Sequence, residues 1–270
     1  MAQGLPILDL GRVGVGGSPG DREVVYAIVE ATLEEGGFFR SKDRGETWEK
    51  RSDIQTSSGQ YYNEIVADPK DPDRVYLMDT WMKVTEDGGK TFRKVGERFK
   101  HVDNHALWID PRNTEHLLAG CDGGIYESFD RGATWKFTDN LPVTQFSRVT
   151  PDNARPFYNV YGGTQDNNTL GGPSRTTTTH GITNADWVVT VGGDGFKTQV
   201  DPDNPDLVYS QSQYGGLIRY DRKTGEVLDI QPQPAPGGDP LRFNWDSPLL
   251  VSRHDPARLY FAAQMVFRSV

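Results

Sequence analysis

The chain has 270 residues, enough to bury a large core as one domain or as part of one. Its net charge of −9 argues against a nucleic-acid backbone as a partner. The lone Cys121 excludes an internal disulfide, and no apolar run reaches the roughly 18 residues of a membrane-spanning helix.

Residues 1–10 lack the basic segment and the apolar stretch of a secretory signal peptide. The 30 glycines and 17 prolines that follow favour many short strands joined by turns. Six units begin along the chain with a turn, usually Asp-Pro, followed by an apolar pair usually closed by tyrosine. They start at residues 18, 68, 110, 150, 201 and 255. Asp and Pro favour a turn there, and the β-branched and aromatic residues favour a strand.

An eight-residue box recurs at 41–48, 85–92 and 128–135, and its aspartates lie 44 and then 43 residues apart. Repeats of this length, with strand-like sequence between copies, are typical of four-stranded β-propeller blades. In the second unit we expect strands at 63–67, 74–78, 81–85 and 91–95. We therefore predict an all-β propeller with about six blades, at residues 5–52, 60–98, 103–140, 145–190, 195–231 and 241–270.

The later units depart from this pattern. In the fourth unit the longer stretch 171–186 replaces the box, and in the fifth an ordinary hairpin turn at 221–225 does so. In the sixth, 267–269 matches 39–41, so a box aspartate would follow the last residue. We predict an incomplete sixth blade and a fragment of a larger propeller protein, whose remaining blades belong to the same polypeptide. The compartment stays open, extracellular or periplasmic if the full-length protein carries a signal peptide.

We expect each box to lock its own hairpin. The aspartate can accept hydrogen bonds from backbone N–H groups, and the glycine suits a positive φ. The aromatic residue would pack between neighbouring blades. A surface of ion-binding carboxylates is the competing interpretation. The structural box residues are Ser41, Asp43, Gly45, Trp48, Asp87, Gly89, Phe92, Ser128, Asp130, Gly132 and Trp135.

The boxes resemble the Asp-box, or BNR, repeat superfamily. Its members include sialidases, xyloglucan-cleaving glycoside hydrolases, sortilin-type receptor propellers and photosystem II stability factors. The segments 122–126 and 193–195 are most similar to large bacterial proteins described as glycosyl hydrolase-like or sortilin-like. The resemblance implies a β-propeller whose boxes lie away from the ligand. The Arg-Ile-Pro motif of sialidases is absent from this sequence.

Hairpins in an up-and-down blade alternate between two faces, so the Asp-Pro turns and the boxes share one face. The remaining loops share the other, and five polar residues fall there: Asp103, His105, Asp122, Asp166 and Asp194. Asp103 and Asp194 each lie seven residues before an Asp-Pro turn, and so occupy equivalent places two blades apart. Two carboxylates roughly 6 to 10 Å apart serve inverting glycosidases as general acid and general base.

Two functions follow. The first is a binding propeller that holds a glycan or a peptide, with His105, Asp122, Gln165 and Tyr214 as ligand-binding candidates. The second is a glycoside hydrolase acting on a polysaccharide through Asp103 and Asp194, with Asp166 in reserve. Whether the protein is an enzyme stays open, because aspartates beside glycine also form ordinary turns. A photosystem-type assembly factor is a third possibility that rests on the fold alone.

Two further features have alternative interpretations. His101, Asp103 and His105 would point to one side of an extended strand and could hold zinc. No fourth ligand is identifiable, so we predict a hydrogen-bonded start of a strand, no metal site and no cofactor. Trp81, Tyr214 and Trp245 lie near the same face, where aromatic rings suit either sugars or packing between blades.

Overall fold

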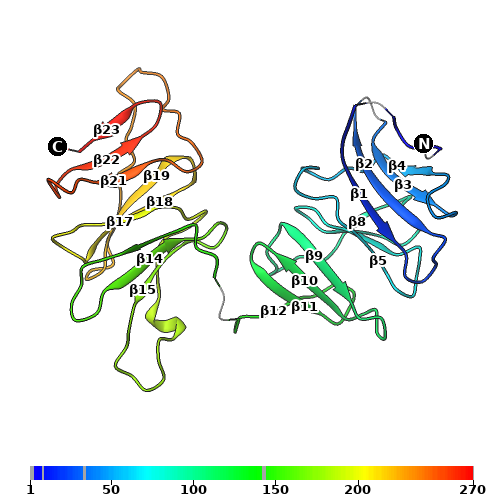
Figure 1. The fold of residues 1–270 in the computed structure, drawn as a ribbon, viewed down its shortest axis with the longest axis horizontal. Helices are drawn as coiled ribbons and strands as arrows, with labels where there is room; N and C mark the ends of the chain where they lie inside the picture. Colours follow the sequence, from blue (N-terminus) through cyan, green and yellow to red (C-terminus); the bar gives the residue numbers. More distant parts are fainter. Residues whose placement is uncertain (1–2, 8, 33–34, 142–143, 270) are drawn as a thin grey trace. The chain divides into compact units, whose positions relative to one another are not determined.

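The computed structural model describes residues 3–7, 9–32, 35–141 and 144–269. They form two compact units, Met1–Leu141 (unit 1) and Pro142–Val270 (unit 2), and each is described by itself (Figure 1). In these ranges the helices are two short 3-10 turns, η1 (Asn184–Asp186) and η2 (Gln213–Gly215). No helix in them has the length and apolar character needed to cross a bilayer.

Unit 1 contains three antiparallel sheets among its described residues, and in each the strands pair in chain order. Sheet 1 consists of β1 (Leu10–Gly17), β2 (Val25–Ala31), β3 (Gly37–Ser41) and β4 (Glu49–Ser52). Sheet 2 consists of β5 (Ile65–Ala67), β6 (Val75–Leu77), β7 (Lys83–Thr85) and β8 (Arg93–Lys94). Sheet 3 consists of β9 (Asn104–Ile109), β10 (Leu117–Cys121), β11 (Gly124–Ser128) and β12 (Lys136–Phe137).

Unit 2 also contains three antiparallel sheets among its described residues, and the last has three strands. Sheet 4 consists of β13 (Arg148–Pro151), β14 (Asn159–Gly163), β15 (Thr169–Pro173) and β16 (Val188–Val191). Sheet 5 consists of β17 (Thr198–Val200), β18 (Leu207–Ser212), β19 (Gly216–Asp221) and β20 (Val227–Asp229). Sheet 6 consists of β21 (Leu249–Val251), β22 (Leu259–Ala262) and β23 (Val266–Arg268).

These sheets confirm the predicted fold class, an all-β chain of propeller blades. Inside unit 1 the first strands of sheets 1 and 2, β1 and β5, contact each other. In unit 2 the first strand of each sheet contacts that of the next, from β13 to β17 and from β17 to β21. Strands in sheet 2 are shorter than predicted, and each begins one or two residues later than expected.

Apolar side chains fill the space between sheets in unit 1. The core between sheets 1 and 2 consists of Val24, Tyr26, Ile28, Phe38, Ile65, Ala67, Val75 and Leu77. A second core, between sheets 2 and 3, consists of Tyr76, Met78, Met82, Val84, Val95, Ile109, Leu117 and Ala119. Strands β2 and β6 contribute side chains to cores on both of their faces. Their sequences are therefore continuous apolar runs and do not alternate between apolar and polar residues.

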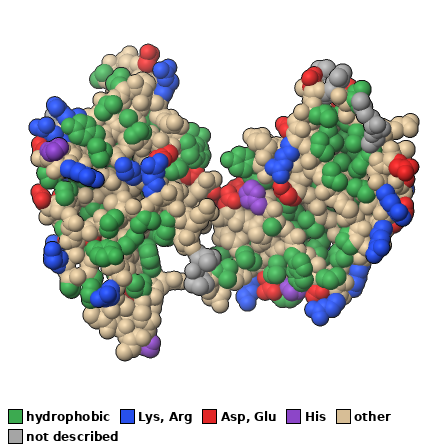
Figure 2. Space-filling view, in the orientation of Figure 1, with side chains coloured by type: hydrophobic (Ala, Val, Ile, Leu, Met, Phe, Trp, Pro, Cys, Tyr) green, Lys and Arg blue, Asp and Glu red, His purple; other side chains and the backbone are tan. Residues whose placement is uncertain are grey.

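Unit 2 differs, because the contact between sheets 4 and 5 is polar. The hydroxyls of Thr190 and Ser210 lie 2.8 Å apart, and both side chains are buried. Thr150 donates a hydrogen bond of 2.8 Å to the Thr198 carbonyl across the same contact. The apolar core lies between sheets 5 and 6, with Leu217, Leu249 and Phe261 buried. Apolar side chains exposed on the surface are spread over both units (Figure 2).

Each box aspartate accepts hydrogen bonds from its own hairpin. Asp87 Oδ1 accepts the backbone N–H groups of Lys90 and Thr91 at 2.9 and 3.0 Å, and Oδ2 accepts the Thr91 hydroxyl at 2.6 Å. Asp43 and Asp130 make the same pair of bonds to Thr47 and Thr134. Each box is thus held by hydrogen bonds within itself, as expected of a hairpin lock.

The box glycines have φ values of 94° at Gly45, 93° at Gly89 and 85° at Gly132, in the left-handed region. A Cβ at Gly89 would lie 2.4 Å from the ring of Phe38. The aromatic residues behave unequally. Phe92 and Trp135 pack against the cores shared with the preceding sheet. Trp48 does not lie between two blades as we expected, because it packs on its own sheet against Ala27, Val29 and Phe39.

Box and Asp-Pro turn are joined directly by backbone hydrogen bonds. Arg44 donates to the Glu23 carbonyl at 3.0 Å, Gly88 to Asp73 at 2.9 Å, and Arg131 to Glu115 at 3.0 Å. Each bond links the β3–β4 type of hairpin to the β1–β2 type within one sheet. The predicted sharing of one face by these two loops is therefore confirmed in all three sheets of unit 1.

The hydrogen bonds of the box also lower the pKa of its aspartate. Partial burial alone would raise the pKa of Asp87, but the bonds from Thr91, Thr85 and Lys90 outweigh it and hold the pKa well below its usual range. The Thr47 hydroxyl and backbone, with Ser41, lower the pKa of Asp43 to about 2. These carboxylates therefore stay ionised in mild acid.

We expect Asp87→Ala to lower the free energy of unfolding by about 2 kcal/mol at pH 7, because several bonds to a charged acceptor are lost. A carboxyl whose pKa is lower in the folded than in the unfolded protein stabilises the folded state. This stabilisation is complete above the pKa in the unfolded chain, near 3.9, and is lost as the pH falls. The difference from wild type should be constant above about pH 5 and shrink below about pH 4. Urea unfolding at several pH values measures it.

Asp139→Ala is the matched control, because Asp139 is exposed and follows the third box without belonging to it. It should change stability by less than about 0.5 kcal/mol. Equal effects of the two variants, or a pH-independent difference for Asp87→Ala, would contradict a structural lock.

Candidate functional site

The loops of unit 1 that lie away from the boxes are bonded to one another. Asp103 N–H donates to the Thr80 carbonyl at 2.9 Å, which joins the loop before β9 to the loop after β6. Asp122 N–H donates to the Asp103 carbonyl at 3.2 Å, which adds the hairpin between β10 and β11. These three loops form one end of the unit, opposite the end that carries the boxes.

A buried ion pair supports this end. Lys100 Nζ lies 3.3 Å from Glu97 Oε1, and both side chains are almost wholly buried. Lys100 also donates to the side chain of Asn104, whose Nδ2 donates to the Asp79 carbonyl at 3.1 Å. Because removing one partner of a buried pair leaves an uncompensated charge, this link fixes the loop before β9.

Four side chains meet on this support. Tyr62 donates its hydroxyl proton to Asp103 Oδ1, and its ring stacks on His105 with centroids 5.4 Å apart. His105 Nε2 lies 3.1 Å from Asp122 Oδ1. Burial, and then the bond to Asp103, raise the pKa of Tyr62 to about 12, so this phenol remains a donor at neutral pH. We call Tyr62, Asp103, His105 and Asp122 the unit 1 cluster.

His101 does not join this cluster through its Nδ1 atom. That nitrogen lies 3.0 Å from the Val102 carbonyl, its own neighbour in the chain. His105 pairs with Asp122 as described. His101 thus forms a hydrogen bond and His105 a close polar contact inside the unit, which corresponds to the alternative of a hydrogen-bonded start of a strand.

In unit 2 the corresponding end is built from two interlocked loops, 164–168 after β14 and 192–197 before β17. Asp166 N–H donates to Asp194 Oδ1 at 2.8 Å, and Gly195 N–H donates to the Thr164 carbonyl at 2.9 Å. Asn168 N–H donates to the Gly193 carbonyl at 3.0 Å. We call this pair of loops the unit 2 clasp.

The clasp depends on glycine at its closest approach. A Cβ at Gly163 would lie 2.1 Å from the backbone of Gly195, and a Cβ at Gly195 would lie 2.4 Å from the Asn168 carbonyl oxygen. Real side chains never approach so closely, so any larger residue would push the two loops apart. The clasp leaves Gln165 and Asn167 exposed and Asp166 half-buried.

An exposed aromatic pair lies on the same end of unit 2. Tyr214, in η2 between β18 and β19, meets Trp245 edge to face at 4.7 Å. Tyr214 has φ of 56°, a left-handed conformation that a tyrosine rarely adopts. A Cβ at Gly215 would lie 2.2 Å from the ring of Phe243, so this glycine lets the turn rest on the segment that carries Trp245.

Next to this pair is a pocket of about 380 Å³. Its polar lining includes Arg148, Lys197 and Asp246, and its apolar lining includes Leu250 and Tyr260. Arg148 and Asp246 form an ion pair of 3.0 Å. The buried Gln211 donates to the other oxygen of Asp246 at 2.8 Å, which fixes this carboxylate at the pocket wall.

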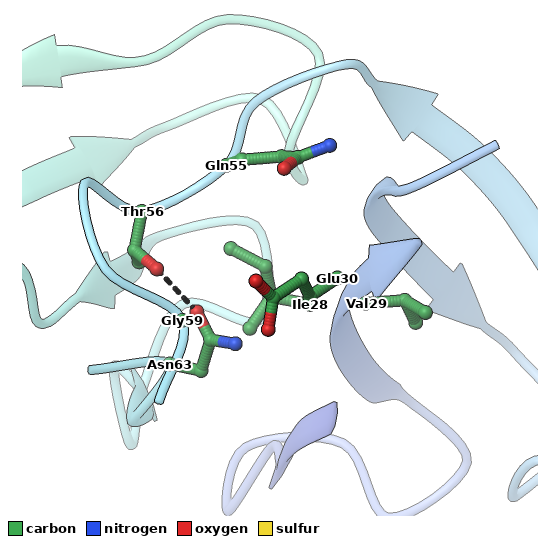
Figure 3. A pocket seen from close by; sticks show the side chains of 7 residues that line it. All are labelled: Ile28, Val29, Glu30, Gln55, Thr56, Gly59 and Asn63. Carbon is green, nitrogen blue, oxygen red and sulfur yellow. Dashed lines mark hydrogen bonds between the residues drawn. The ribbon is translucent and has the colours of Figure 1, made fainter. Parts of the chain in front are cut away.

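A second pocket, in unit 1, is too small for an organic ligand. It lies between sheet 1 and the loop before β5, beside Glu30 and Asn63, and its volume is about 10 Å³ (Figure 3). Thr56 donates to Asn63 Oδ1 at 2.6 Å on one wall. This space corresponds to about one water molecule, so we assign it no binding role.

The predicted site residues divide between the units. Unit 1 brings together Asp103, His105 and Asp122, and unit 2 brings together Gln165, Asp166, Asp194 and Tyr214. The predicted acid pair, Asp103 and Asp194, takes one residue from each unit, and its catalytic role stays a prediction. Asp194 is 5% exposed, and its Oδ1 accepts the Asp166 N–H.

Sequence reasoning missed several residues of these sites. They are Tyr62, Arg148, Gln211, Gln213 and Asp246. Tyr62 follows another tyrosine in an ordinary loop, and only the fold shows that it points to Asp103. Gln211 and Gln213 alternate along β18 and its turn, and this spacing at the end of a strand is the signal that could have identified them.

Comparison with known proteins decides the family. Residues 36–196 match the sequence profile of Sortilin-Vps10, described as sortilin, neurotensin receptor 3. This chain belongs to the Sortilin-Vps10 family. The matched segment contains all three boxes, the unit 1 cluster and all of the clasp except residue 197. Membership confirms the predicted resemblance to sortilin-like propellers.

Curated relatives of this Sortilin-Vps10 chain are xyloglucanases. Xyloglucanase Xgh74A of Acetivibrio thermocellus is 27% identical over 87% of this chain and 33% of its own length. The oligoxyloglucan-reducing end-specific xyloglucanase of Emericella nidulans is 28% identical over 50% of this chain and 18% of its own. The chain thus spans a third or less of the length of these relatives.

Among solved structures, the GH74 enzyme of Niastella koreensis is 12% identical over 96% of this chain and 44% of its own length, with a TM-score of 0.38.

We expect Tyr62→Phe to lower the free energy of unfolding by about 2 kcal/mol, because it removes a donor to the charged, half-buried Asp103. Tyr61→Phe is the control, since Tyr61 is 63% exposed. It should change stability by less than about 0.5 kcal/mol. Urea denaturation of both variants measures the difference, and equal stabilities would show that the hydroxyl does not hold the unit 1 cluster together.

Proposed function

We propose that this Sortilin-Vps10 chain binds a glycan of the xyloglucan type on the loop ends opposite its boxes. The observation that carries the proposal is the exposed Tyr214–Trp245 pair beside the pocket of unit 2. Aromatic faces bind the apolar faces of sugar rings, and the polar groups around them orient the hydroxyls. Arg148 and Asp246 in the pocket wall offer a donor and an acceptor for this purpose.

The backbone of these loops supports a binding role. Asp103, Asp166, Asn168 and Tyr214 all have positive φ, between 56° and 71°. Each such residue costs about 1–3 kcal/mol, and strain of this kind gathers at ligand sites. Box residues with positive φ lie in box turns, whereas Tyr214 combines a left-handed backbone with an exposed aromatic ring.

The loop end of unit 1 also carries exposed aromatic side chains beside polar groups. Tyr61, Trp81 and Phe99 are exposed there, in the loops before β5, after β6 and before β9. Next to them the unit 1 cluster supplies an imidazole and carboxylates. Two relatives are named xyloglucanases, which supports a neutral polysaccharide over a peptide as the ligand. The name neurotensin receptor in the family description makes a peptide the competing ligand.

We expect Tyr214→Ala and Trp245→Ala each to weaken the binding of xyloglucan oligosaccharides about tenfold, the effect of losing one stacking contact. Isothermal titration calorimetry on the full chain measures it. Tyr158→Ala is the control, because Tyr158 is 51% exposed at the turn between β13 and β14, at the end of unit 2 opposite the aromatic pair. This variant should bind like wild type.

Saturable binding of a neurotensin-like peptide but of no glycan would contradict the glycan proposal. So would equal affinities of wild type, Tyr214→Ala and Trp245→Ala for the oligosaccharide. Loss of binding in Tyr158→Ala as well would show that the aromatic substitutions act through general destabilisation.

Hydrolysis is the second candidate function, and the half-buried Asp166 on its strained loop favours it. A general acid needs a carboxyl beside the bound sugar, and Asp166 lies on the same loop end as the aromatic pair. Asp103, Asp166 and Asp194 are the residues to replace by Asn. Release of reducing ends from xyloglucan that disappears in Asp166→Asn would support an enzyme. Binding without any release by wild type would support the binding module.

A further inference from the structure

Asp194 lies where three loops of unit 2 meet. It belongs to the connection between β16 and β17, and it is 5% exposed. The loop 164–168 donates a hydrogen bond to its side chain, and η2 accepts one from its backbone N–H. Burying a carboxylate costs free energy unless hydrogen bonds compensate for the lost water, so the hydrogen bonds of Asp194 explain why it can be buried here.

The carboxylate of Asp194 secures the loop 164–168. Its Oδ1 accepts the N–H of Asp166 at 2.8 Å. Asp166 and Asn168 have φ of 61° and 71°, so two residues of this short loop are in the left-handed region without being glycine. Such backbone persists only where the surroundings over-determine it. The bond from Asp194 is one of the contacts that impose this conformation.

The backbone of Asp194 secures η2. Its N–H donates to Gln213 Oε1 at 2.8 Å, and a Cβ at the neighbouring Gly193 would lie 2.6 Å from that same oxygen. Gln213 directly precedes Tyr214, whose ring meets Trp245. One residue therefore reaches Asp166 through its carboxylate and the aromatic pair through its amide.

We propose that Asp194 is a positioning residue that joins the Asp166 loop and the Tyr214 turn into a single ligand-binding surface. This inference rests on the proposed function for its consequence in ligand binding, but the coupling itself is a property of the fold. It assigns Asp194 a role different from that of a general acid or base. What matters is the hydrogen-bond acceptor at Oδ1, which an asparagine can also provide.

Three variants of the full chain test the coupling. Asp194→Ala removes the acceptor, Asp194→Asn retains an oxygen at Oδ1, and Gln213→Ala breaks only the second link. Hydrogen–deuterium exchange of segments 164–168 and 213–215 is read without any ligand. Asp203→Ala is the control, because Asp203 is an exposed residue in the turn between β17 and β18.

We expect about tenfold faster exchange at 164–168 in Asp194→Ala, the effect of losing one hydrogen bond. Asp194→Asn should exchange like wild type there. Gln213→Ala should accelerate exchange at 213–215 and leave 164–168 unchanged. Xyloglucan oligosaccharide should bind about tenfold more weakly to Asp194→Ala and within about twofold of wild type to Asp194→Asn.

Equal loss of protection in Asp194→Asn and Asp194→Ala would overturn the proposal, because the charge and not the acceptor would then be required. Unchanged exchange in Asp194→Ala would overturn it too. If the exchange results are as expected but wild type binds no glycan, the positioning role stands and the proposed function fails. Release of reducing ends that is lost in Asp194→Asn while its exchange stays like that of wild type would make Asp194 catalytic and overturn the proposal.

Discussion

The hairpin lock of the box is the interaction on which the rest of unit 1 depends. A carboxylate such as that of Asp87 binds the N–H groups of its own turn, and the same box bonds the neighbouring Asp-Pro turn through Gly88. Two loops of one sheet are thereby fixed at one end. Because antiparallel strands alternate in direction, the remaining loops lie at the opposite end.

The two ends of the sheets have opposite chemistry for this reason. At the box end, the aspartates accept hydrogen bonds from the backbone of their own turn. Few of their acceptor sites therefore remain for a ligand. At the other end, side chains reach across loops, as Tyr62 does to Asp103 and Asp194 does to Asp166. Asp103 and Asp166, which take part in these contacts between loops, both have a φ of 61°, in the left-handed region.

The interiors of the two units show how the scaffold supports these ends. Unit 1 buries aromatic and aliphatic side chains between its sheets, with a buried Lys100–Glu97 pair beneath its cluster. Unit 2 places hydroxyls between sheets 4 and 5 and brings glycine backbones into contact at Gly163 and Gly195. Close backbone approach excludes bulky apolar residues there, and hydrogen bonds take over the role of a core.

The sequence by itself determined the all-β blades, the positions of the boxes and the sharing of one face by boxes and Asp-Pro turns. These features are local or periodic, so the order of residues contains them. It also placed Asp103, His105 and Asp122 on one loop end. Only the tertiary structure decided that Tyr62 completes their cluster, that Trp48 packs on its own sheet, and that Asp194 is buried against Asp166 and Gln213. Those outcomes depend on which loops of separate blades meet, and no spacing along the chain specifies such long-range contacts.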